Sequence, residues 1–128
     1  MESVTHKPIR VLVANRPRLM RELILATFSD QPDIVIVDEV PEEADIPAGV
    51  EKTRPDFVII TQDRFGERPS VCDIVLRQHP KIRIIAIVPR QSLAVYYWSS
   101  VNINSRQVEA SEEAILGVLR THGSPLVA

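Results

Sequence analysis

The residues of this chain that could do chemistry follow directly after apolar runs. The run FVII stops at Thr61, and Asp63 lies two positions further on, while the earlier run IRVLVA is followed at once by Asn15 and Arg16. A carboxylate can act as a nucleophile toward phosphorus, and a guanidinium can bind an anion. What these groups can do together depends on the elements that position them.

Five apolar runs alternate along the chain with segments whose apolar residues have helical spacing. Runs that are hydrophobic throughout are typical of strands covered on both faces, as in a parallel sheet. We therefore expect an α/β domain, doubly wound around a five-stranded parallel sheet. The runs cover residues 9–14, 34–37, 57–60, 82–88 and, more weakly, 101–108.

Prolines and capping residues indicate where the helices begin. Pro17 suits the first turn of the first helix, Ser70 after a proline suits the start of the third, and Ser111 before two glutamates suits the N-cap of the last. The second helical segment, VPEEADIPAGVEK, contains two prolines and a glycine. We expect that helix to be short or irregular.

Length and composition indicate one ordinary globular domain. The 128 residues are 45% hydrophobic and 25% charged, and we expect a single domain over 1–128, with a core from about 8 to 120 and a tail over 122–128. The net charge of −2 does not predict binding to nucleic acid or to an anionic membrane. Three scattered histidines and one cysteine, Cys72, predict neither a metal site nor a disulfide. No stretch resembles a signal peptide or a membrane span, so we expect a cytoplasmic protein.

Ligands of such sheets bind outside the carboxyl ends of the strands, and there the chain resembles a known family. The segments IRVLVANRPRLMREL, RPDFVII, HPKIRIIAIVP and EASEEAILGVLR are similar to parts of CheY-like receiver domains of bacterial response regulators. The likeness runs from about Pro8 to Arg120. It implies a flavodoxin-like (βα)5 fold and a role in two-component phosphorelay signalling.

The resemblance also implies a set of site residues, and this chain lacks all of them. A working receiver has an acidic pair after its first strand, a phosphoacceptor aspartate ending the third, a Thr or Ser ending the fourth and a Lys ending the fifth. Matched residue by residue, these positions hold Asn15 and Arg16, Thr61, Val88 and Val108. An acyl phosphate needs a carboxylate, and Mg²⁺ needs oxygen ligands. We therefore expect a vacated phosphorylation pocket with no catalytic residue, no metal and no cofactor.

Other residues near the vacated pocket have more than one interpretation. Asp63 could be a displaced phosphoacceptor, but we favour a loop carboxylate that pairs locally, because no aligned group would hold a metal beside it. Asn15, Arg16 and Arg90 could form an anion site in place of the metal, although an ordinary surface arginine is the simpler interpretation of Arg16. The apolar replacements at the fourth and fifth strand ends are expected to make the pocket partly closed and drier.

The function that these observations predict is that of a pseudo-receiver. Such a module is not phosphorylated and is not an enzyme, and it acts in two-component type regulation through protein interaction. Two alternatives stay open: a small-molecule or anion-binding α/β domain, and an atypical phosphorelay receiver that uses Asp63.

Three consecutive aromatic residues point to a partner surface. Tyr96, Tyr97 and Trp98 lie in RQSLAVYYWSSV, the expected fourth helix. Consecutive helical residues fan out by about 100°, so at least one ring must face outward. Receivers usually dimerise or contact their output domains through the fourth helix, fifth strand and fifth helix. We therefore expect a protein partner or a homodimer at this face, centred on Tyr96 and Trp98, and no direct binding of nucleic acid or membrane.

Overall fold

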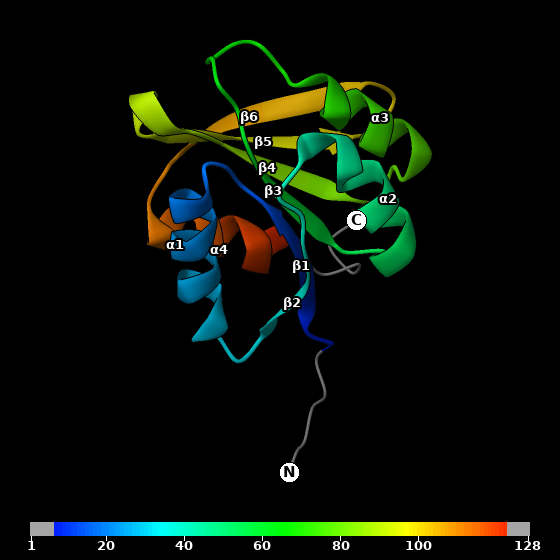
Figure 1. Cartoon of the computed structure of the whole chain (residues 1–128). Coiled ribbons are helices and arrows are strands. Elements are labelled where there is room, and N and C mark those ends of the chain that lie inside the picture. Colours follow the sequence, from blue (N-terminus) through cyan, green and yellow to red (C-terminus); the bar gives the residue numbers. More distant parts are fainter. Residues whose placement is uncertain (1–6, 123–128) are drawn as a thin grey trace.

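A computed structural model describes residues 7–122, in which helices cover both faces of one six-stranded sheet (Figure 1). The strands are β1 (Ile9–Ala14), β2 (Ile34–Glu39), β3 (Phe57–Thr61), β4 (Arg83–Val88), β5 (Leu93–Ser99) and β6 (Ile103–Glu109). The helices are α1 (Arg18–Ser29), α2 (Ile46–Thr53), α3 (Ser70–Gln78) and α4 (Glu112–His122), with single 3-10 turns at η1 (Glu43–Asp45) and η2 (Pro89–Gln91).

The sheet is mixed, which corrects the expected five-stranded parallel arrangement. The strand order is β2-β1-β3-β4-β5-β6, and the first four strands in this order are parallel. β5 and β6 then continue the sheet as an antiparallel pair, with β5 antiparallel to β4 as well. The first four strands were predicted correctly, because each contains a continuous apolar run, and β1, β3 and β4 are buried on both faces.

The expected fourth helix is instead the strand β5. Its central residues, AVYY, are two aromatic residues, a valine and an alanine, a composition that favours a strand over a helix. The connection from β4 is only η2 and Ser92, whose φ of 51° turns the chain sharply. A connection this short can join antiparallel neighbours only, because a parallel neighbour needs a long crossover.

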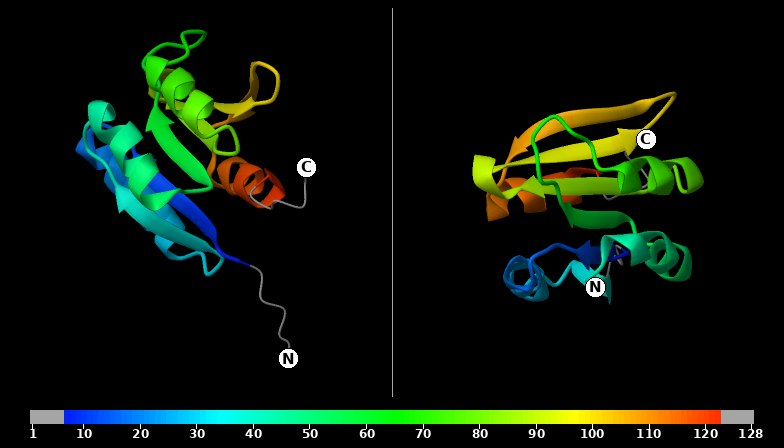
Figure 2. Two further views of the ribbon diagram at one scale, coloured as in Figure 1. Left: turned by 90° about the vertical axis from the view of Figure 1, so that its right-hand side faces the viewer. Right: turned by 45° about the horizontal axis from the view of Figure 1, so that its top comes forward.

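Two hydrophobic cores lie on the two faces of the sheet. One packs α2 and α3 against alternate strand residues such as Leu12 and Ile60, and the other packs α1 and α4 against their neighbours, such as Val11 and Ile59. Figure 2 shows the two helical layers with the sheet between them. Burial on both faces is the physical reason why β1, β3 and β4 are unbroken apolar runs.

The helix boundaries agree with the prolines and capping residues of the sequence. Pro17 is the N-cap of α1, α3 begins at Ser70, and the backbone N–H of Ala114 donates to the Ser111 hydroxyl at 3.1 Å at the start of α4. α2 has only eight residues. α4 ends at His122, so that residue belongs to a helix and not to a tail, and residues 123–128 lie outside the described part of the chain.

Candidate functional site

The loops after β1 and β3 meet because these strands are neighbours in the sheet. The Thr61 hydroxyl accepts a hydrogen bond from the Arg16 backbone N–H at 3.0 Å and donates to the Arg16 carbonyl at 2.9 Å. The side-chain amide of Asn15 donates to the same hydroxyl oxygen at 3.3 Å. Thr61 is only 4% exposed. Its hydroxyl therefore holds two loops together and is not presented to solvent.

The Arg16 side chain lies between two carboxylates. Its two terminal nitrogens donate to the two oxygens of Asp63 at 3.2 and 3.0 Å, and Glu43 Oε1 lies 3.5 Å away. The hydrogen bond from Arg16 lowers the pKa of Asp63, and the same bond raises the pKa of Arg16. Asp63 is thus an ionised loop carboxylate with a local partner, as we favoured from the sequence.

The structure does not gather the three residues of the expected anion site. Asn15 has no exposed surface, and the Arg16 guanidinium already contacts Asp63 and Glu43. Arg90 lies in η2 and lines a hollow that neither Asn15 nor Arg16 lines. Asn15, Arg16 and Arg90 therefore do not form one site.

Val88 and Val108 do not share a pocket either. β5 lies between their strands, and Ala94 of β5 is paired with Val108 on one side and with Ile87 on the other. Residues paired directly across antiparallel strands point to the same face, so Val108 shares a face with Ile87 and not with Val88. Val88 is buried in the core beneath α2 and α3, and Val108 packs against the core beneath α1 and α4. The expectation that the two valines jointly close one pocket is wrong.

Gln62 is a site residue that the sequence analysis missed. It is 1% exposed and accepts a hydrogen bond of 2.6 Å from the Tyr97 hydroxyl. Its side-chain amide donates to the Arg64 carbonyl at 2.8 Å, and its backbone N–H donates to the Ile87 carbonyl at 2.8 Å. Burial raises the pKa of Tyr97 to about 12, so this phenol remains protonated and donates. Gln62 thereby fastens the loop after β3 to β4 and β5. The signal in the sequence was a glutamine directly after a buried strand.

The three consecutive aromatic residues lie on a strand, which corrects the expected interface. Tyr96 and Tyr97 point to opposite faces of the sheet, and each is only 4% exposed. Trp98 is half-buried and stacks on Tyr96 with ring centroids 5.0 Å apart. Tyr96 and Tyr97 are therefore core residues, and of the three rings only that of Trp98 reaches the surface to any extent.

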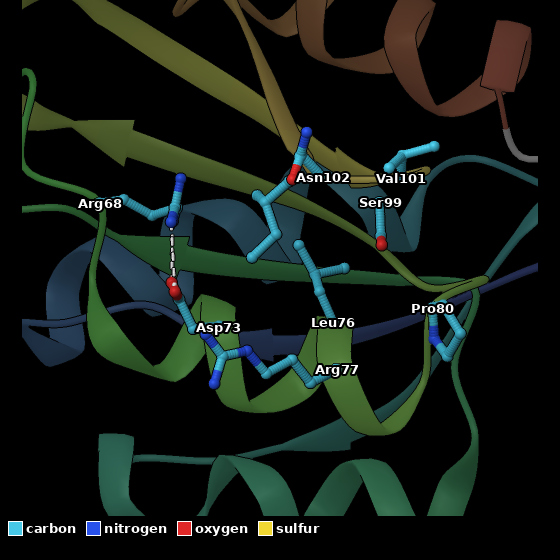
Figure 3. A pocket seen from close by; sticks show the side chains of 9 residues that line it. Arg68, Asp73, Leu76, Arg77, Pro80, Ser99, Val101 and Asn102 are labelled. Atoms are coloured by element: carbon cyan, nitrogen blue, oxygen red, sulfur yellow. Dashed lines mark hydrogen bonds and ion pairs between the residues drawn. The ribbon is translucent and has the colours of Figure 1, made fainter.

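Two hollows on the surface of residues 7–122 are large enough to hold a small molecule. One, of about 520 Å³, opens at the carboxyl ends of β3 and β4 and is lined by Asp63, Arg64, Phe65, Arg90 and Gln91. The other, of about 510 Å³, runs along α3 beside the turn between β5 and β6. Figure 3 shows that the second contains the paired Arg68 and Asp73, with Leu76, Val101 and Asn102 nearby.

Residues 7–122 contain neither a cluster of metal-binding side chains nor a membrane-spanning helix. Among them, no three His, Cys, Asp or Glu side chains come close enough together to hold a metal ion. No helix of this described range has the length and apolarity needed to cross a membrane.

Comparisons with known proteins identify the fold. No family model and no curated protein matches the chain. Among solved structures, it is similar to the signal receiver domain of the response regulator NarL from Mycobacterium tuberculosis, with 20% sequence identity and a TM-score of 0.57. The likeness covers 65% of this chain and 68% of that one. The chain therefore has a CheY-like receiver fold, an α/β domain with a mostly parallel sheet.

Proposed function

We propose that this domain is a pseudo-receiver, a signalling module of two-component type that acts by binding a protein and not as an enzyme. The observation that carries the proposal is the position of Arg16. Its guanidinium lies beside the loops that follow β1 and β3. These loops correspond to the positions of the acidic pair and the phosphoacceptor in a working receiver. The phosphoacceptor position itself holds Thr61, whose hydroxyl is buried and bonded to backbone.

Electrostatics favours this proposal over an atypical receiver that uses Asp63. Unit charges about 4 Å apart interact by roughly 4 kcal/mol at an effective dielectric constant of 20. A divalent cation placed beside Arg16 would be repelled by the guanidinium, and it would have to compete with Arg16 for Asp63 and Glu43. Both oxygens of Asp63 already accept hydrogen bonds from Arg16, so the carboxylate is poorly placed to attack a phosphoryl donor.

The proposal includes a protein partner or a second copy of the chain at the face formed by β5, β6 and α4. This face takes the place of the receiver surface that usually makes such contacts. β6 is an edge strand in the described residues, and edge strands offer backbone groups to an added strand. Trp98 on the neighbouring strand supplies a half-buried aromatic ring. We also propose a cytoplasmic location, supported by the single free cysteine, which is buried.

Phosphorylation is the direct test. We expect no phosphorylated species after incubation with acetyl phosphate and millimolar Mg²⁺, measured by intact mass and by phosphate-affinity electrophoresis, with a working receiver as the positive control. Thr61→Asp should also stay unlabelled, because Arg16 would remain in the metal position. A phosphorylated product that hydroxylamine cleaves, and that disappears in Asp63→Asn, would contradict the proposal and favour the atypical receiver.

A further inference from the structure

The hollow at the carboxyl ends of β3 and β4 has the size and position of a ligand site. It measures about 520 Å³, and small-molecule pockets in proteins span about 300–1,000 Å³. Its walls are the loop after β3 and the turn η2 after β4. Ligands of open α/β sheets bind in the crevice outside these strand ends. We call it the Arg64–Arg90 hollow, after the two arginines among its five lining residues.

The charges of the Arg64–Arg90 hollow favour an anion. Asp63, its one acidic residue, is already neutralised by Arg16. Arg64 has a single contact with a carboxylate, Glu67 at 3.7 Å, and both side chains are more than 60% exposed, at 77% and 67%. Arg90 makes no ion pair and no side-chain hydrogen bond within residues 7–122. A carboxylate or phosphate is the group that would satisfy two such guanidinium groups.

An exposed aromatic ring stands beside these charges. Phe65 is 48% exposed, although the chain has only six aromatic residues that could fill its core. The next residue, Gly66, has a φ of +87°, a conformation that other residues rarely adopt, so the loop turns immediately after the ring. A phenyl ring at the wall of a hollow can stack on a planar group of a ligand.

The walls of the Arg64–Arg90 hollow are held in place before any ligand arrives. Gln62 is bonded to the Arg64 carbonyl, to the Ile87 carbonyl and to the Tyr97 hydroxyl, and it is buried beneath the loop. On the other side, Ser92 in a left-handed conformation fixes the end of η2. A preformed site loses less conformational entropy on binding, so a small ligand can be bound with useful affinity.

We propose that the Arg64–Arg90 hollow binds a small anion that carries a planar aromatic ring. The guanidinium groups of Arg64 and Arg90 bind its carboxylate or phosphate, and Phe65 stacks on its ring. This inference goes beyond the proposed function, because binding does not depend on whether Asp63 is ever phosphorylated. In a pseudo-receiver, such a ligand would provide the input that phosphorylation provides elsewhere, and only this last step relies on the proposed function.

The test is an NMR titration of the ¹⁵N-labelled full chain with probes built on one ring. We expect 1-naphthyl phosphate, 1-naphthoate or both to produce saturable shifts in the amides of residues 63–66 and 90–92. Neutral 1-naphthol and inorganic phosphate alone should bind at least about tenfold more weakly, since each lacks one of the two contacts. The relative affinity of the two naphthyl anions then shows whether the site prefers phosphate or carboxylate.

Variants connect the shifts to the named residues. Arg90→Gln and Phe65→Ala should each lower the affinity for whichever of the two naphthyl anions binds more tightly by about tenfold. Arg77→Gln, which removes the same charge from an exposed position on α3 outside the hollow, should leave the affinity unchanged. The altered side chains are exposed, and an unchanged amide spectrum elsewhere will verify the fold.

Three results would overturn the inference. They are the absence of saturable shifts with both naphthyl anions at millimolar concentration, shifts confined to residues outside the hollow, and equal affinities of Arg90→Gln and the unaltered chain. Binding of inorganic phosphate as tight as that of 1-naphthyl phosphate would overturn the contact with Phe65. Labelling by acetyl phosphate is measured without these probes, so failure of the proposed function is recorded separately from failure of the ligand site.

Discussion

Arg16 forms its ion pair with Asp63 across two loops that are far apart in the sequence and adjacent in the sheet. Both groups are substantially exposed, with 40% and 71% of their side-chain surfaces accessible. Water and salt screen such a pair, so its contribution to the free energy of unfolding is at most about 1 kcal/mol. Its main consequence is therefore chemical, because it occupies the carboxylate and places a positive charge where a metal would be needed.

Arg16→Ala tests the pairing through the pKa of Asp63. The folded-state pKa of Asp63 is lowered by Arg16, so the pair stabilises the fold above the unfolded pKa of about 3.9 and this contribution disappears as pH falls through the folded-state pKa. In Arg16→Ala, the carboxyl of Asp63 should titrate at higher pH, measured by ¹³C NMR. The free energy of unfolding at pH 7 should fall by at most about 1 kcal/mol. Arg18→Ala, which removes a different exposed pair, is the control and should not move the titration of Asp63.

The buried hydrogen bond between Tyr97 and Gln62 should contribute more to stability than the exposed ion pair. Tyr97→Phe leaves the Gln62 oxygen buried without its donor, at a cost of about 1–3 kcal/mol in the free energy of unfolding. Urea denaturation of Tyr97→Phe, Gln62→Leu and the double variant gives the coupling between the two side chains. If the two single losses simply add, the two groups do not act as a bonded pair in solution.

At the scale of elements, β5 shows what limited the prediction from sequence. The parallel strands and helix starts were predictable, because unbroken apolar runs, prolines and capping residues are local signals. The segment LAVYYWS carries no helical spacing, and its residues from Ala94 to Tyr97 are buried on both faces. That pattern is the one that identified the other strands, but the expected alternation of strands and helices placed a helix there. The site was incompletely predicted for the same reason, since β5 lies between the strands of Val88 and Val108 and separates these two residues.

The turn between β4 and β5 offers a test of whether this segment forms a strand in place of the expected fourth helix. Ser92 has a φ of 51°, where a side chain adds strain that glycine avoids. Ser92→Gly should therefore raise the free energy of unfolding by up to about 1 kcal/mol, measured in urea. Ser100→Gly, in the turn after β5, has no such strain to relieve and is the comparison. A fourth helix running through this segment would instead be weakened by glycine at position 92, so a loss of stability would argue against the hairpin.

At the scale of the whole molecule, the hairpin of β5 and β6 changes which surfaces are available to a partner. A receiver that keeps its fourth helix presents a helical face, whereas the sheet of residues 7–122 ends in an exposed edge strand packed on one side by α4. Tyr96 and Trp98 point to that side together and stack on each other. Their different burial assigns them different roles, with Tyr96 in the core and Trp98 at the margin of the proposed contact surface.

Alanine substitutions separate these two roles. Tyr96→Ala should cost about 3–5 kcal/mol in the free energy of unfolding, as the loss of a fully buried aromatic ring does. Trp98→Ala should cost less, because its ring is only half-buried, and it should weaken self-association or partner binding in sedimentation velocity runs over a range of concentrations. Ser105→Ala, at an exposed β6 position on the opposite face of the sheet, is the matched control for association. An oligomer whose concentration dependence is the same in Trp98→Ala and in the unaltered chain would place the contact surface elsewhere on the molecule.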